Sequence, residues 1–361
     1  MRILTITGIR PDFIRMSKIF KKFDENFEHI LVHTGQHYDK LLSDVFFEEL
    51  QIRKPDYNLE IGGTGKEHFH QAADLSIKII ELIRKENLKP DLIVFMGDSN
   101  SVVSAVALKK EGYKIGHIEA GMRSYDKRML EEINRTVCDH CSDYLFVYHE
   151  NYKMNALLEN IHSDQIFVVG NTIVEPSRDM QAVIYQKPKA YSHIILDIHR
   201  PENFNDEFRL QNIMFFASEM HRIYHFPVKM LNFGRTESRL KEWCIPLWET
   251  KIIPLMSYKN YIQAVYDSAF IISDSGTAQE EPCLFGTPVI VPRDFTERPE
   301  SVESNCSIML DVNTVYNPTW YHAMDYVSAA LLNQINVDVE WLGDGKTSQL
   351  IVDKIKELFK K

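Results

Sequence analysis

The sequence predicts an α/β protein made of two Rossmann-like domains, each built on a doubly wound parallel sheet. Short apolar runs alternate with amphipathic helical stretches almost from one end of the 361-residue chain to the other. This alternation favours parallel strands that are joined by right-handed crossovers. Eleven such runs, without counting a further one at 165–169, are too many for one open sheet of this kind, so two sheets are expected.

The expected strands of the first half are 1–7, 29–34, 91–97, 114–120 and 143–149, with a further strand at 165–169. Those of the second half are 193–199, 227–232, 251–256, 269–275, 287–293 and 306–311. Long helices are expected between them, for example over 65–87 and 98–113. The predicted domains are 1–171 and 172–345, followed by a helical segment at 346–361.

Composition excludes several classes of protein. A hydrophobic content of 44% and a charged content of 25% are those of a globular protein, and a net charge of −10 argues against a nucleic-acid partner. No apolar run is long enough to span a membrane, and the first residues lack the features of a signal peptide. We therefore expect a cytoplasmic protein with no membrane partner.

The five cysteines are too few and too scattered for a disulfide framework. Cys138 and Cys141 form a C-D-H-C motif that invites a metal or redox interpretation. The motif falls inside a helical stretch and has no second pair at ligand spacing. We interpret both residues as helix packing and predict no metal site.

Ligands of such sheets bind at the carboxyl ends of the strands, so the residues that follow each apolar run are the candidate ligand-binding residues. The first run is followed by T-G-I-R-P-D, where Gly8 precedes Arg10 at the start of a helix. A helix N-terminus attracts anions, so this turn is a candidate diphosphate site with Arg10 and Arg15 as cations. A plain helix start is the alternative.

The next strand ends in this half carry carboxylates. Asp98 follows the strand 91–97, where capping of the next helix is the simpler role. His117 and Glu119 alternate on one face of the strand 114–120. Glu131 and Glu132 lie in the first turn of a helix, where the dipole favours carboxylates, so one of the pair is explained by structure alone.

The second half adds polar groups of other kinds. The strand 193–199 ends in His199, and the strand 269–275 leads into Ser275, Gly276 and Thr277 at an expected helix N-terminus. An ordinary strand, cap and helix with acidic residues in solvent would also explain this stretch.

Glu281, one turn into that expected helix, is suited to accept hydrogen bonds from the two hydroxyls of a ribose. Arg298, in T-E-R-P-E, would be a second cation for a diphosphate. Together the strand-end residues of both halves indicate a nucleotide-sugar site.

The sequence resembles the non-hydrolysing UDP-N-acetylglucosamine 2-epimerase family over nearly its whole length. The similar stretches, in the family's order, are TGIRPDFIRM, HTGQHYD, MGDSNS, HIEAGMRS, EEINR, IHRPEN, SDSGTAQEE and RDFTERPES. The resemblance implies two Rossmann-like domains facing across a cleft, as in glycosyltransferase-B-like folds, with the last helix packed on the first domain. It also implies a homodimer.

The resemblance assigns roles residue by residue. Asp98, Glu119 and Glu131 match the catalytic carboxylates and His199 matches the active-site histidine. The positions that match the UDP-binding residues are Arg10, Ser275, Gly276, Glu281 and Arg298.

Several positions depart from the family's pattern. Arg15 stands where many members have lysine, and Thr277 replaces a usual glycine. The short loop SYDKR and the stretch FFEELQIRKPDYNL look more like a subgroup that acts on UDP-2-acetamido-2,6-dideoxy-L-hexoses.

The reaction that this resemblance implies is anti elimination of UDP across carbons 1 and 2, followed by re-addition with the proton delivered to the other face. It needs acid–base groups near carbon 2 and cations around UDP, but no cofactor. Three alternatives stay open: a hydrolysing epimerase, a retaining glycosyltransferase and a nucleotide-sugar binding protein without activity.

Overall fold

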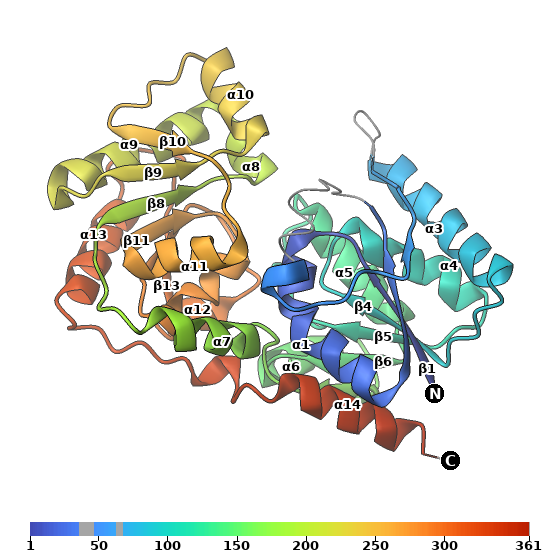
Figure 1. Cartoon of the computed structure of the whole chain (residues 1–361). Coiled ribbons are helices and arrows are strands. Elements are labelled where there is room, and N and C mark those ends of the chain that lie inside the picture. The colour runs from blue at the N-terminus through green and yellow to red at the C-terminus, as the bar shows by residue number, and fades with distance from the viewer. Residues whose placement is uncertain (36–46, 63–67, 361) are drawn as a thin grey trace. The chain divides into compact units, whose positions relative to one another are not determined.

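The computed structural model describes residues 1–35, 47–62 and 68–360. The chain forms two compact units, one made of Met1–Pro176 and Leu342–Lys361 and the other of Ser177–Trp341 (Figure 1). We call them unit 1 and unit 2. The chain therefore leaves unit 1 once and returns to it for its last helix.

Unit 1 is built on a seven-stranded sheet in the order β3-β2-β1-β4-β5-β6-β7, in which every pair of neighbours is parallel. Its strands are β1 (Arg2–Thr7), β2 (Glu28–His33), β3 (Tyr57–Asn58), β4 (Leu92–Met96), β5 (Ile115–Ile118), β6 (Tyr144–Val147) and β7 (Ile166–Val168). Its helices include α1 (Arg10–Asn26), α3 (His68–Lys85), α4 (Ala105–Lys110), α5 (Leu130–Cys141), α6 (Glu150–Leu158) and α14 (Thr347–Leu358). Two short 3-10 turns are η1 (Asn100–Ser104) and η2 (Ser163–Gln165).

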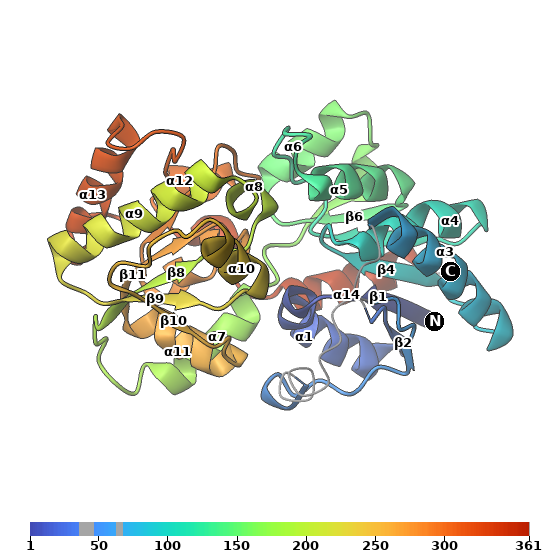
Figure 2. The same cartoon turned by 90° about the horizontal axis from the view of Figure 1, so that it is seen from above.

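Helices cover both faces of this sheet because successive strand side chains point to opposite faces. Ile3 of β1 packs in one core with α1, α6 and α14, whereas its neighbour Leu4 packs in the other core with α3, α4 and α5. Figures 1 and 2 both show α14 beside α1, and Lys356 Nζ of α14 donates to Asn26 Oδ1 at 2.6 Å. Segments more than 300 residues apart in the chain thus share one core.

Unit 2 repeats the plan with a six-stranded parallel sheet in the order β10-β9-β8-β11-β12-β13. Its strands are β8 (His193–Asp197), β9 (Val228–Leu231), β10 (Thr250–Ile253), β11 (Ser268–Ser273), β12 (Val289–Val291) and β13 (Ser307–Met309). Its helices are α8 (Pro201–Phe204), α9 (Glu207–Tyr224), α10 (Gly234–Glu242), α11 (Tyr258–Asp267), α12 (Pro299–Glu303) and α13 (Pro318–Leu331). The turns η3 (Thr277–Gln279), η4 (Pro282–Phe285) and η5 (Glu340–Leu342) are 3-10, and α7 (Val174–Ile184) crosses from unit 1 into unit 2.

The predicted fold class is confirmed, because both sheets are parallel and have the strand order of doubly wound folds. Two local predictions were wrong, and one strand was missed. The two-residue strand β3 was not predicted. The helix expected over 98–113 is divided into the 3-10 turn η1 and the short α4, and the helix expected after Thr277 is two 3-10 turns, η3 and η4.

The absence of an α-helix after Thr277 has a visible cause. Pro282 lacks the N–H that a continuing helix needs, and its ring would collide with the preceding turn, so the chain cannot form one helix through Glu281.

The two cysteines of α5 pack as predicted. Cys138 is buried in the core, and the partly buried Cys141 packs against that core. In the described part of the chain, no helix has the length and apolar content needed to cross a bilayer.

Candidate active site

The predicted site residues of unit 1 follow the ends of neighbouring strands. Asp98 comes just after β4, Glu119 just after β5, and Glu131 in the first turn of α5. Arg10 is the first residue of α1, and Arg15 lies in its second turn. Parallel strands bring these ends to one edge of the sheet.

Glu119 lies against Arg15. Arg15 Nη1 is 3.0 Å from Glu119 Oε2, and both side chains are almost completely buried. The backbone of Glu119 has φ of 69°, an uncommon value for a residue with a side chain, which indicates a position held by its surroundings. The role of Arg15 as a diphosphate ligand stays a prediction, and in this structure its guanidinium compensates the buried carboxylate of Glu119.

The turn between β1 and α1 is occupied by a carboxyl group of its own. Asp12 Oδ2 accepts from Thr7 Oγ1 at 3.2 Å and from the N–H groups of Gly8 and Ile9, both at 3.4 Å. A side chain at Gly8 would collide with Thr34 Oγ1, so packing explains the glycine. The N–H groups predicted for a diphosphate at Gly8 are therefore used by Asp12.

Asp12 is buried, and its pKa is raised to about 7. Burial is the largest cause, the two backbone N–H groups act in the opposite direction, and the negative charges of Asp98 and Glu119 raise the pKa further. Three carboxyl groups thus influence one another at the ends of β1, β4 and β5, and one of them holds a proton near neutral pH.

Asp98 binds a buried arginine. Arg135 Nη2 of α5 makes a short contact with Asp98 Oδ2, and Arg135 Nη1 lies 3.0 Å from Glu132 Oε2. Asn134 Nδ2 donates to the Asp98 carbonyl at 2.9 Å. Asp98 therefore has a charge partner, and the capping role weighed for it falls instead to Ser99, whose side chain accepts from Ser101 N.

The two glutamates at the start of α5 have different environments. Glu132 is buried and accepts from the N–H groups of Ser124 and Tyr125 at 3.0 and 2.9 Å, so it fastens the preceding loop. Glu131 is only half-buried in the same turn. Of this pair, Glu132 is the structural member.

His117 does not share the environment of Glu119. Its ring is fully buried, with Nδ1 2.6 Å from Asp139 Oδ1 and Nε2 2.7 Å from the Gly97 carbonyl. Both partners are acceptors, so both ring nitrogens donate. Asp139 Oδ2 also accepts from Gly121 N at 3.0 Å. This layer fixes the backbone beside Asp98 and Glu119.

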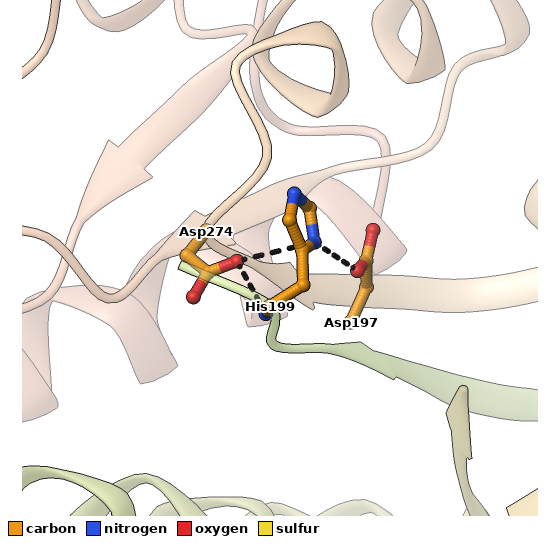
Figure 3. Close-up of side chains that lie close together, drawn as sticks. All are labelled: Asp197, His199 and Asp274. Atoms are coloured by element: carbon orange, nitrogen blue, oxygen red, sulfur yellow. Dashed lines mark hydrogen bonds and ion pairs between the residues drawn. The ribbon is translucent and has the colours of Figure 1, made fainter. Parts of the chain in front are cut away.

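In unit 2, His199 lies just beyond the end of β8 between two aspartates (Figure 3). Its Nδ1 is 2.9 Å from Asp197 Oδ1, and its backbone N–H donates to Asp274 Oδ1 at 3.0 Å. Burial alone would lower the pKa of His199, but the carboxylates of Asp197 and Asp274 outweigh it, and the pKa is raised.

Asp197, His199 and Asp274 place one ligand atom each within 4.8 Å of one another, a spacing at which a metal ion could be considered. Their hydrogen bonds favour another interpretation. Asp274 Oδ1 accepts from His199 N, and Asp274 Oδ2 accepts from Arg200 N at 3.1 Å and from Asn203 Nδ2 at 3.0 Å. The carboxylates are engaged in orienting the loop and the imidazole.

The residues 275–277 after β11 form a tight turn. Ser275 N donates to Ser273 Oγ at 3.1 Å, and the hydroxyls of Ser275 and Thr277 are 2.9 Å apart. A Cβ on Gly276 would lie 2.7 Å from Arg298 Nη1, so the glycine permits close approach of that guanidinium. The predicted helix N-terminus is absent here, because only the three-residue turn η3 follows.

Glu281 is buried, and two hydroxyl groups donate to its Oε1. Ser177 Oγ donates at 3.2 Å, and the Tyr258 hydroxyl of α11 makes a short hydrogen bond. The carboxylate is thereby fixed in one orientation, which is what bidentate binding of a diol would require.

Arg298 is buried among carboxylates. Its Nε is 2.8 Å from Glu280 Oε1, and its Nη1 makes a short contact with Glu297 Oε1. Glu297 Oε2 also lies 3.1 Å from Arg293 Nη1. The role of Arg298 as a cation for a diphosphate stays a prediction, and within unit 2 its guanidinium pairs with Glu280 and Glu297.

Several residues of these two clusters were not predicted as site residues, namely Asp12, Arg135, Asp197 and Tyr258. The sequence held a signal for two of them. Asp12 is at the third position of α1, where a carboxylate caps the helix, and Arg135 follows Glu132 at the i,i+3 spacing of an ion pair. The motif HTGQHYD extends through 36–39, which lie outside the described residues.

The two doubly wound sheets, with acid–base groups and arginines at their strand ends, define a two-domain α/β enzyme. Residues 21–356 match the UDP-N-acetylglucosamine 2-epimerase family, and the chain belongs to this family. The predicted family and the predicted enzyme class, an isomerase, are confirmed.

Individual relatives cover the whole chain. The UDP-N-acetylglucosamine 2-epimerase of Methanocaldococcus jannaschii is 35% identical over 98% of each chain. The crystal structure of that organism's enzyme in complex with UDP-GlcNAc and UDP has a TM-score of 0.89 and 33% identity, covering 99% of this chain and 100% of that one. The UDP-2,3-diacetamido-2,3-dideoxy-D-glucuronate 2-epimerase of Pseudomonas aeruginosa is 32% identical over 99% of this chain and 100% of its own.

Proposed function

We propose that the protein inverts carbon 2 of a UDP-N-acetylhexosamine without net hydrolysis. The observation that carries this proposal is the pair of carboxylates Asp98 and Glu119, each held against its own buried arginine at neighbouring strand ends. Family membership supports it, since relatives over the full length carry the name of 2-epimerases.

The proposed reaction begins with loss of the carbon 2 proton to a base. The electrons of the carbon–hydrogen bond form a double bond between carbons 1 and 2, and UDP departs with the electron pair of the carbon 1–oxygen bond. UDP then adds back to the glycal while an acid delivers a proton to the opposite face of carbon 2. Atoms and electrons balance without a cofactor.

Asp98, Glu119 and Glu131 are the proposed acid–base groups for this proton traffic. An adjacent guanidinium favours the charged form of a carboxylate, so Arg15 and Arg135 favour the deprotonated forms of Glu119 and Asp98, which are the forms able to accept a proton.

The UDP part of the substrate is assigned to residues of unit 2 and to Arg10. We propose that His199 donates to the diphosphate, that Ser275, Gly276 and Thr277 line it, and that Glu281 accepts from the ribose hydroxyls. Arg298, whose Nε and Nη1 bind carboxylates, is proposed as a second cation for the diphosphate. Cations around the diphosphate stabilise the charge that develops as UDP leaves.

For the sugar, we propose a UDP-2-acetamido-2,6-dideoxy-L-hexose in preference to UDP-N-acetylglucosamine. The support is the short loop at 124–128, which resembles that subgroup and is fastened by Glu132 through Ser124 and Tyr125. The P. aeruginosa relative is named for a sugar other than N-acetylglucosamine, so sugar identity varies at this level of similarity. We also propose a homodimer, which light scattering of the purified protein tests.

The first experiment is incubation in D2O with UDP-N-acetylglucosamine and, separately, with UDP-2-acetamido-2,6-dideoxy-L-talose, followed by proton NMR. For the second substrate we expect deuterium at carbon 2, appearance of the epimer, and a constant total amount of nucleotide sugar. Free UDP with free sugar would indicate the hydrolysing epimerase instead. Absence of exchange in both sugars would reject the mechanism and favour a transferase, which needs an acceptor.

The second experiment is Glu119→Gln. The substitution keeps the shape of the side chain but removes its basicity, so turnover should be lost while UDP affinity by calorimetry stays within about twofold. Glu81→Gln, an exposed change on α3, is the matched control. Retained turnover in Glu119→Gln would remove Glu119 from the mechanism.

A further inference from the structure

The environment of His199 contains two carboxylates that the proposed chemistry has not used, Asp197 and Asp274. Asp197 is the last residue of β8, two positions before His199. Its Oδ1 is 2.9 Å from His199 Nδ1, and its Oδ2 accepts from Ser273 Oγ of β11 at 3.1 Å. Asp197 is 5% exposed, so the carboxylate is held by the sheet rather than by solvent.

Other groups around the ring point to the same orientation. Asp274 Oδ1 holds the His199 backbone N–H and lies 3.5 Å from Nδ1. The Phe233 ring, just after β9, packs on the imidazole with centroids 4.8 Å apart. The positive charge of Arg200, which follows in the chain, acts against the carboxylates and lowers the pKa of His199. Tyr261 on α11 stays neutral, because burial and the charges of Asp197 and Glu281 raise the pKa of its hydroxyl.

Because both oxygens that face Nδ1 belong to carboxylates, Nδ1 must carry a hydrogen. Figure 3 shows the second ring nitrogen, Nε2, pointing away from both aspartates. The ring therefore has one nitrogen committed to the protein and one directed elsewhere, which is how a second carboxylate orients a functional histidine.

We propose that Asp197 is a positioning residue that fixes Nδ1–H of His199, so that Nε2–H is presented as a charged donor to the diphosphate of the nucleotide. This inference rests on the proposed function for its ligand. It adds a residue that acts through His199 and predicts that the histidine binds the nucleotide in its doubly protonated form.

The test compares Asp197→Asn with the wild type and with Asp325→Asn, an exposed aspartate on α13, as the matched control. In ligand-free protein, nitrogen-15 NMR of the histidine rings should show the titration midpoint of His199 about one pH unit lower or more in Asp197→Asn. The control should leave that midpoint unchanged.

UDP affinity supplies a second readout. At pH 8, calorimetry should show UDP binding roughly tenfold weaker in Asp197→Asn, because less of the imidazole is charged. Near pH 5.5, where both proteins have a charged His199, the difference should disappear. If Asp197→Asn only disturbed side-chain packing, UDP binding would be weakened equally at both pH values.

The inference is overturned if the His199 midpoint is unchanged in Asp197→Asn, or if the loss of affinity does not depend on pH. Saturable binding of Mn²⁺ that Asp197→Asn abolishes would also overturn it in favour of a cation site. Neither readout requires turnover, so a failed epimerase assay with the expected titration shift would reject the proposed reaction and leave the role of Asp197 standing.

Discussion

Substitution of Asp12 by asparagine should stabilise unit 1 at alkaline pH and much less at acid pH. The buried carboxyl holds its proton up to about pH 7, whereas an unperturbed aspartate releases it near 3.8. Between these values the folded protein binds a proton that the unfolded chain has lost. The contribution of Asp12 to the free energy of unfolding is therefore fully present below pH 3.8 and is lost as the pH rises towards 7.

The size of the effect follows from the two pKa values. Their difference of about 3 units corresponds to about 4 kcal/mol, because one unit is worth about 1.4 kcal/mol. Between pH 5 and pH 8 the raised pKa of Asp12 therefore lowers the free energy of unfolding by about 2.5 kcal/mol. Asparagine keeps an oxygen that can accept from Thr7, Gly8 and Ile9, and it carries no charge at any pH.

Urea unfolding at pH 5 and pH 8 measures this difference for wild type and Asp12→Asn, with the exposed Asp164→Asn as the control. All four tryptophans, at 243, 248, 320 and 341, belong to unit 2. The transition of unit 1 is thus the part of the circular dichroism change that tryptophan fluorescence does not follow. A stability difference that is the same at both pH values, or larger at pH 5, would refute the argument.

Two further substitutions test the clusters described above. Arg135→Met removes the cation that Asp98 and Glu132 share. Because breaking a buried ion pair leaves a buried charge uncompensated, the substitution should lower the free energy of unfolding of unit 1 by about 3–5 kcal/mol. A urea midpoint equal to that of the wild type would contradict this expectation. Gly276→Ala places a Cβ 2.7 Å from Arg298 Nη1. The substitution should lower the free energy of unfolding by about 1–3 kcal/mol and weaken UDP binding. An unchanged melting temperature would show that the guanidinium moves aside without loss of stability.

The places of the site residues in the fold could be predicted from the sequence because they depend on local rules. An apolar run followed by a polar residue marks the carboxyl end of a strand, and that rule located Asp98, Glu119 and His199. The partners of these residues could not be found in the same way. Asp98 and Arg135 are 37 residues apart, and their contact depends on how α5 packs on the sheet.

Charge compensation was the main property that sequence reasoning missed. Arg15 and Arg298 were both assigned to a diphosphate because cations near strand ends suit that ligand. The structure surrounds them with Glu119, Glu280 and Glu297, and a buried arginine needs such carboxylates whatever else it does. The protonated state of Asp12 was likewise hidden, since it arises from burial and from charges on other strands.

The return of the chain to unit 1 has a consequence for how the protein is made. Ile351, Val352 and Ile355 of α14 fill the same core as Phe13 and Met16 of α1, yet they are synthesised after the whole of unit 2. A ribosome-bound chain that has completed unit 2 therefore still exposes the apolar face of α1. Nascent unit 1 is the part of this protein that we expect a chaperone to bind, and release of α14 from the ribosome is the event that ends that need.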